Sequence, residues 1–152
     1  MKIAIISGSP SDKSVIEAAD PYIEYFGLHV EKRILSAHRN PKELATFIKE
    51  FEESDGRIFI GVAGMAAHLP GVIASHTSKP VLGVPVEGPS LAGFDSLLSI
   101  VQMPKGIPVA TFAVGKAGMI NAIIFAAQIF AGESPEMNDK VKAFKAQGSK
   151  LN

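Results

Sequence analysis

The chain opens with a continuous apolar run, Lys2–Ser7, that is rich in β-branched residues and stops at a glycine. An unbroken run of this kind is typical of a strand buried on both faces of a parallel sheet. The same kind of pattern predicts four more strands further along the chain. They are expected at His29–Leu35, Arg57–Val62, Pro80–Val84 and Pro108–Val114.

Helical spacing of apolar residues fills the segments between these runs. The first predicted helix follows the turn Ser9-Pro10-Ser11-Asp12 and reaches about Phe26, and Pro21 is expected to kink or interrupt it. A second helix opens at Asn40-Pro41 and places apolar residues three, four and seven positions after Leu44. The remaining helices are expected near Leu69–His76, Leu91–Gln102, Ala117–Ala131 and, as a charged tail, about 135–148.

Strands that alternate with helices through short turns of Gly, Pro and Ser predict a parallel sheet with right-handed crossovers. The expected fold is therefore α/β: a three-layer αβα sandwich with a central parallel sheet, flavodoxin- or Rossmann-like. No linker, repeat or low-complexity segment divides the chain, so residues 1–152 are expected to form a single domain. A domain of this size buries roughly 70% of its unfolded surface.

The segment Ala117–Ala131 is apolar or small on every face, with only Asn121 and Gln128 polar. A helix of this kind is buried all round, and one sheet covers only one of its faces, so another subunit is expected to cover the rest. The segment is shorter than the roughly 20 residues that span a membrane, and the first residues lack the apolar core of a signal peptide. A soluble protein with no membrane partner is expected.

Composition narrows the possible partners and chemistry. Hydrophobic residues make up 47% of the chain and charged residues only 20%, which disfavours disorder. Net charge is zero and no basic stripe is present, so no nucleic-acid partner is expected. The absence of cysteine excludes disulfides and a thiol nucleophile, and is compatible with the cytoplasm. No closely spaced histidine pair or carboxylate cluster points to a metal.

The loop after the first predicted strand reads Gly8-Ser9-Pro10-Ser11-Asp12. Ligands of open parallel sheets bind beyond the carboxyl ends of the strands, where hydroxyls and free N–H groups at a helix start can cradle a phosphate. A carboxylate beside that cradle can accept hydrogen bonds from ribose hydroxyls. A plain helix N-cap is the alternative interpretation. The spacing fits neither a dinucleotide-binding fingerprint nor a Walker loop, which disfavours redox and NTPase functions.

The loop after the second strand reads Ser36-Ala37-His38-Arg39. An arginine grips phosphate with two hydrogen bonds, a serine donates to it, and an imidazole exchanges its proton near neutral pH. An ordinary loop histidine is the alternative, but the flanking residues and the strand-end position favour function. A Ser-His-Asp hydrolase built on Ser36 or Ser9 ranks low, because no nucleophile elbow is present.

The loop after the third strand is made of small residues, Gly64-Met65-Ala66-Ala67-His68-Leu69-Pro70-Gly71. Small side chains allow a planar ligand to approach the backbone, whose N–H groups can stabilise a carboxylate or oxyanion. The alternative is a tight turn in which His68 caps a helix or bonds inside the fold. The other two histidines, His29 and His76, are interpreted as ordinary structural or surface residues.

Together these loops closely resemble one family, the N5-carboxyaminoimidazole ribonucleotide mutases of purine biosynthesis. The resemblance covers nearly the whole chain, in order. The matching stretches are Gly8–Asp12, Ser36–Arg39, Ala66–Gly71, Pro80–Pro85, Asp95–Leu97, Ser99–Pro104, Gly106–Val109 and the apolar helix after Asn121. Two departures are Ser7, where the family commonly has Met, and Met65, where it often has Gly.

The resemblance implies roles for individual residues. His38 would be the general acid/base of an isomerase that removes the carboxyl group from the exocyclic nitrogen and adds it back at C4. Ser11, Ser36 and Arg39 would hold the phosphate with Ser9 nearby, and Asp12 would hold the ribose. The expected substrate-binding residues are Ser9, Ser11, Asp12, Ser36, Ala37, Arg39, Gly64, Ala66, Ala67, His68 and Leu69. The resemblance also implies a cytoplasmic homo-octamer that needs no cofactor and no metal.

Two alternatives remain beside the mutase. A direct aminoimidazole ribonucleotide carboxylase would use free carbon dioxide, but that branch usually has Lys after the loop histidine and lacks the Ala-His-Leu-Pro-Gly stretch. Arg39 and His68–Gly71 therefore favour the mutase branch. A non-catalytic module that binds a phosphoribosyl ligand would keep Ser11, Asp12 and Arg39 but would not need His38.

Overall fold

A parallel sheet runs through the centre of the computed structural model, which describes residues 1–151. In this part of the chain five strands pair side by side, in the order β2-β1-β3-β4-β5. The strands are β1 Lys2–Ser7, β2 His29–Ile34, β3 Gly56–Gly64, β4 Val81–Val86 and β5 Ala110–Thr111. From β1 the chain first moves outward to β2 and then crosses back over β1 to β3, so the strand order reverses at β1.

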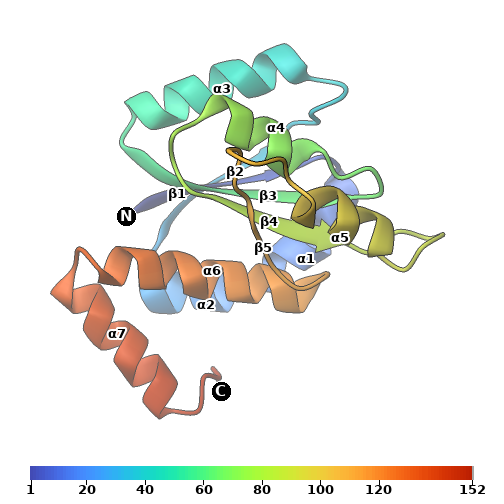
Figure 1. Cartoon of the computed structure of the whole chain (residues 1–152). Coiled ribbons are helices and arrows are strands. Elements are labelled where there is room, and N and C mark those ends of the chain that lie inside the picture. Colours follow the sequence, from blue (N-terminus) through green and yellow to red (C-terminus); the bar gives the residue numbers. More distant parts are fainter. Residues whose placement is uncertain (152) are drawn as a thin grey trace.

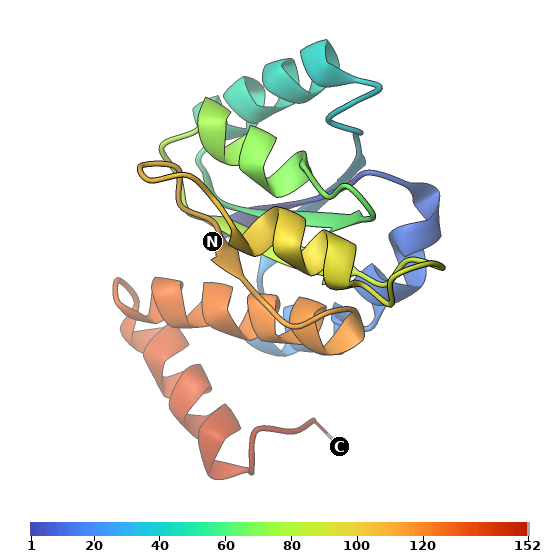
Figure 2. The same cartoon turned by 45° about the vertical axis from the view of Figure 1, so that its right-hand side comes forward.

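Helices cover both faces of the sheet, which confirms the predicted three-layer α/β class (Figure 1). One layer contains α3 and α4, and the opposite layer contains α2 and α6. The last helix, α7, packs on α6 and extends away from the sheet, as the turned view in Figure 2 also shows. The helices are η1 Pro10–Asp12, α1 Lys13–Glu17, α2 Asp20–Phe26, α3 Pro41–Glu53, α4 Leu69–His76, α5 Phe94–Val101, α6 Lys116–Ala131 and α7 Pro135–Ala146.

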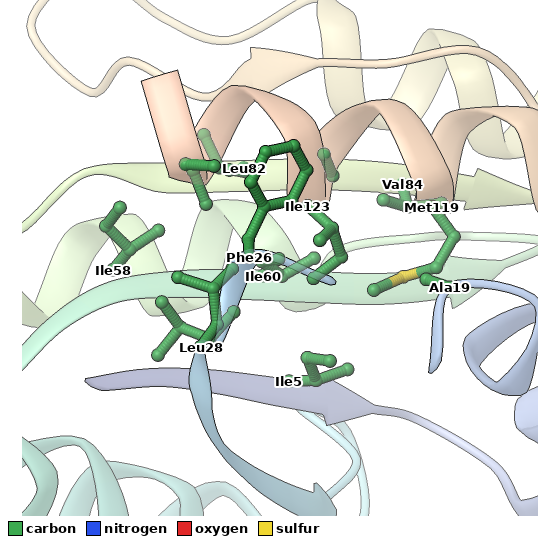
Figure 3. Packing of buried hydrophobic residues seen from close by; sticks show 14 of the residues in the cluster. Ile5, Ala19, Phe26, Leu28, Ile58, Ile60, Leu82, Val84, Met119 and Ile123 are labelled. Atoms are coloured by element: carbon green, nitrogen blue, oxygen red, sulfur yellow. The ribbon is translucent and has the colours of Figure 1, made fainter. Parts of the chain in front are cut away.

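Alternation along β1 divides its side chains between two apolar cores. Ile3 and Ile5 enter the core between the sheet and α6, part of which is drawn in Figure 3. Ala4 and Ile6 enter the core beneath α3 and α4. Each isoleucine that is fully removed from water stabilises the fold by about 1.5–3 kcal/mol. The uninterrupted apolar sequence of β1 is therefore explained by burial on both of its faces.

The predicted β3 and β4 end two residues too early, and three other predicted elements differ more from the structure. The helix expected up to Phe26 is divided into α1 and α2, and Pro21 stands in the first turn of α2, where its missing N–H is tolerated. The helix expected from Leu91 begins only at Phe94, because the residues before it have left-handed backbone torsions. The fifth strand is reduced to Ala110–Thr111, which are in register with Leu82 and Gly83 of β4. The N–H of Phe112 still donates to the carbonyl oxygen of Gly83 at 2.9 Å, but the strand does not continue.

Helix α6 buries one face completely and leaves the other partly open. The residues of its inner face are all buried in the core that α6 shares with the sheet: Met119, Ala122, Ile123, Ala126, Ala127 and Phe130. On the outer face the Phe125 side chain is 39% exposed, and Ile120 and Ile124 are half-buried. The monomer therefore leaves an apolar stripe on α6 that water still reaches.

No helix within residues 1–151 combines the length and apolar character that a membrane crossing requires.

Candidate active site

A cavity of about 580 Å³ lies beyond the carboxyl ends of β1 to β4. Parallel strands bring the loops that follow them to one end of the sheet, and the reversal of strand order at β1 opens a crevice there. The three loops predicted from the sequence all reach this cavity, and a fourth loop joins them. The lining residues are Gly8, Ser9, Ser11, Asp12, Ser36, Ala37, His38, Arg39, Gly64, Met65, Ala66, Leu69, Val86, Glu87, Gly88 and Pro89.

The loop after β1 supplies hydroxyl groups and one carboxylate. Ser9 caps η1 by accepting a hydrogen bond of 3.2 Å from the N–H of Ser11. The Ser11 hydroxyl donates to Ser9 Oγ at 2.8 Å and lies 3.3 Å from Oδ1 of Asp12. Ser9 thus both caps η1 and lines the cavity, so the two interpretations of this loop, a helix N-cap and a phosphate cradle, are compatible.

Asp12 is a carboxylic acid that is only 6% exposed. Burial raises the pKa of this carboxyl above its ordinary value of 3.8, since removal from water disfavours the charged form. Hydrogen bonds from the Ser11 side chain and the Ser9 backbone offset part of that rise in pKa. An ionised Asp12 therefore costs folding free energy in the unliganded protein.

The loop after β2 is tied to the loop after β1 by Arg39. Its Nη2 donates to the carbonyl oxygen of Gly8 at 2.8 Å, and its backbone N–H donates to Oγ of Ser36 at 3.3 Å. Ser36 is buried, and its carbonyl accepts a hydrogen bond of 2.8 Å from the N–H of Asn40. The guanidinium is thus held against the loop after β1, and it lines the same cavity as Ser9, Ser11 and Ser36, a combination suited to an anion.

The loop after β3 lines the cavity with Gly64, Met65, Ala66 and Leu69. Met65 has a left-handed φ of 57°, and its side chain is 63% exposed. The Cγ atom of Met65 lies 3.5 Å from the point where a Cβ on Gly88 would stand, so the methionine reaches toward the fourth loop.

Two residues predicted to bind substrate, Ala67 and His68, are not among the described residues that line the cavity. Ala67 is buried in the apolar core beneath α3 and α4, so its side chain has no access to a ligand. The exposed ring of His68 contacts His38 instead: Nδ1 of His68 lies 2.7 Å from Nε2 of His38, and the rings are perpendicular. His68 therefore contacts a cavity-lining residue without lining the cavity itself.

The end of β4 at Val86 and the loop that follows it, Glu87–Pro89, were not among the predicted site residues. Its strand-end position was the available signal, because the same rule that singles out the other three loops applies to it. Ser96 of α5 anchors this loop by donating to the carbonyl oxygen of Val86 at 2.8 Å. Glu87 adds a second carboxylate to the cavity lining.

The part of the chain that the structure describes contains no evident metal-binding site. Within residues 1–151 no group of three or more His, Asp or Glu side chains lies close enough together to hold a metal ion.

Comparison with known proteins gives one consistent family. The AIR carboxylase family model matches residues 2–150. An N5-carboxyaminoimidazole ribonucleotide mutase of Vibrio cholerae serotype O1 is 48% identical over 147 residues, which are 97% of this chain and 91% of the relative. The mutase of the same name from Escherichia coli K12 is 45% identical over 144 residues, 95% of this chain and 85% of the relative.

A solved structure supports the same assignment at the level of the fold. The crystal structure of Treponema denticola PurE superposes with a TM-score of 0.88 at 29% sequence identity. The superposition covers 97% of this chain and 91% of that one.

Substitution of Asp12 by Asn is expected to raise the stability of the unliganded protein at neutral pH. The raised pKa means that the folded state binds the Asp12 proton more tightly than the unfolded state does, so this residue's contribution to stability falls as pH rises above 3.8. The gain in Tm from Asp12→Asn should therefore be largest at neutral pH and vanish below pH 3.8. Thermal melts across pH test this, with exposed Asp139→Asn as control. A loss of Tm at neutral pH would contradict the expectation.

Proposed function

This chain belongs to the AIR carboxylase family, and from that premise we propose that it is an N5-carboxyaminoimidazole ribonucleotide mutase of purine biosynthesis. The enzyme is an isomerase that converts N5-carboxyaminoimidazole ribonucleotide to 4-carboxy-5-aminoimidazole ribonucleotide. The observation that carries the proposal is the identity of 48% and 45%, over nearly the whole chain, with relatives of that name. A cavity that combines an arginine, serine hydroxyls, a buried carboxylate and a histidine fits such a substrate.

The nucleotide's phosphate is assigned to Ser9, Ser11, Ser36 and Arg39. Arg39 already stands between the loops after β1 and β2, where its Nη2 bonds the carbonyl of Gly8. Hydrogen bonds from a guanidinium to a phosphate are charge-assisted and frequently bidentate. The serine hydroxyls that now bond to one another can turn toward the phosphate oxygens with little change in the backbone.

Asp12 is assigned to the ribose. Its buried carboxylate can accept hydrogen bonds from both ribose hydroxyls, which would replace the water lost on burial. Substrate binding then relieves the electrostatic cost that the unliganded protein bears at this residue. The unfavourable free energy of the buried Asp12 carboxylate is therefore recovered on binding and contributes to the free energy of substrate binding.

The aminoimidazole ring and its carboxylate are assigned to the loop Gly64–Leu69, with Ala37 beside it. Gly64 and Ala66 present little side chain, so the flat ring can approach the backbone. Leu69 starts α4, and the positive end of that helix dipole favours a carboxylate. Met65 and Leu69 give this part of the cavity an apolar lining.

His38 is assigned the proton transfers. Its protonated imidazole donates to the exocyclic nitrogen of the substrate, the carbon–nitrogen bond of the carbamate breaks, and carbon dioxide is released inside the cavity. C4 of the electron-rich ring then attacks the carbon dioxide, and neutral His38 removes the C4 proton to restore aromaticity. The histidine ends in its starting state, and retention of carbon dioxide next to C4 supplies proximity.

We further propose a cytoplasmic homo-oligomer, with the octamer that the family resemblance implies. The exposed apolar residues Phe94, Leu98 and Val101 lie at helical spacing along α5, and the exposed Leu91 precedes the helix; Phe94 is 67% exposed. Together with Phe125 on α6, they offer apolar surface that a monomer leaves in contact with water.

Light scattering at micromolar concentration should give the mass of eight chains, and a monomeric mass would contradict this proposal. Cell fractionation tests the cytoplasmic assignment.

The decisive test of function compares two carboxyl donors on the purified protein while following formation of the C4-carboxylated nucleotide. One reaction contains the N5-carboxylated nucleotide without ATP or added bicarbonate, and the other contains aminoimidazole ribonucleotide with saturating carbon dioxide. Efficient turnover of the first alone is expected. A preference for the second would assign direct carboxylation, and tight binding without turnover would assign a binding module.

Substitution of His38 by Asn should reduce kcat by about 10²–10⁴-fold, the usual contribution of a general acid/base. Nucleotide affinity should stay near that of the wild type, because the phosphate and ribose ligands remain in place. Steady-state kinetics and calorimetric titration with the product measure the two effects. His76→Asn is the matched control, since His76 is an exposed residue at the end of α4 and outside the cavity lining. A His38→Asn rate close to that of the wild type would assign the proton to another group.

A further inference from the structure

His38, which lines the cavity, and His68, which does not, come from loops on opposite sides of β1. His38 follows β2 and His68 precedes α4 in the loop after β3, and both strands pair with β1. Nε2 of His38 and Nδ1 of His68 lie 2.7 Å apart, with ring centroids 4.9 Å apart and the rings at 90°. The contact therefore joins the two loops across the carboxyl end of β1.

The backbone holds His68 firmly in place for this contact. Its N–H donates to the carbonyl of Ala66 at 2.8 Å, and its carbonyl accepts from the N–H of Val72 at 2.9 Å in the first turn of α4. The side chain makes no capping bond to α4. The ring of His68 thus serves neither the helix nor the cavity lining, and its hydrogen bond is to His38.

A hydrogen bond between two imidazoles requires one nitrogen to donate and the other to accept, so at least one ring is neutral. When His38 is protonated, its Nε2–H donates and the neutral His68 accepts at Nδ1. When His38 gives up its Nδ1 proton, the Nε2–H remains and the same hydrogen bond persists. With His68 as the acceptor, the contact selects the Nε2–H tautomer of neutral His38 and leaves Nδ1 for the substrate.

We propose that His68 is a positioning residue for the mutase reaction, which fixes the ring orientation and tautomer of His38. Nδ1 of His38 gives its proton to the exocyclic nitrogen and later takes the proton from C4. Nε2–H stays bonded to His68 throughout, so no ring rotation separates the two transfers. This inference rests on the proposed function, because it assigns the proton transfers to His38.

Two substitutions separate the hydrogen bond from the bulk of the ring. His68→Leu removes the bond, and we expect kcat to fall at least about tenfold with KM changed less than about twofold, because loss of a tautomer-fixing partner slows a catalytic histidine. His68→Asn keeps an oxygen near the place of Nδ1 that can accept from Nε2–H, and it should recover most of the lost kcat. His76→Leu, at the other end of α4, is the matched control and should keep the wild-type rate.

Ring ¹⁵N spectra of histidine-labelled protein supply a readout that does not depend on turnover. The His38 signals should show one neutral tautomer in the wild type and in His68→Asn, and a mixture in His68→Leu. Wild-type kcat in His68→Leu, or equal loss in His68→Leu and a folded His68→Asn, would overturn the proposal. If the wild type has no mutase activity, the proposed function fails. The ¹⁵N spectra still decide whether the pair exists: loss of the single tautomer in His68→Leu supports it, and unchanged spectra overturn it.

Discussion

A parallel sheet has to be covered on both faces, because its strands carry apolar side chains on each side and its crossover helices pack against both. Residues 3–6 of β1 are fully buried, with alternate side chains in the two cores. With both faces occupied by helices, the loops at the carboxyl ends of the strands are the parts left free to form a cavity. The site thus depends on the same burial that stabilises the fold.

The pattern of apolar residues and turn residues was sufficient to predict most helices and strands. It was insufficient where the backbone is irregular. The helix at Leu69–His76 was predicted with the bounds that the structure has, because Pro70 marks its start and β4 follows closely. The fifth strand was predicted too long, because an apolar run does not reveal how many residues find a pairing partner. Helix α5 starts later than predicted because Ala92 and Gly93 have left-handed backbone torsions. Such torsions are uncommon for alanine, so the sequence does not predict one at Ala92.

For the site, strand-end position was the informative signal, and side-chain direction was beyond the reach of the sequence. Ser9, Asp12 and Arg39 line the cavity as the loop positions suggested. Ala67 belongs to the same small-residue loop, but its side chain turns into the core, a difference that composition does not encode. The contact between His38 and His68 joins residues 30 positions apart, so only the folded sheet brings them together.

Both edges of the sheet are poorly suited to accept another strand. At one edge β2 carries the charged residues Glu31, Lys32 and Arg33, and at the other β5 is only two residues long. Charged side chains and very short strands are the usual means by which proteins prevent edge-to-edge pairing. A continuous intersubunit sheet is therefore disfavoured. Assembly through the helices and loops is favoured instead, and it would leave the strand register inside each subunit independent of its neighbours.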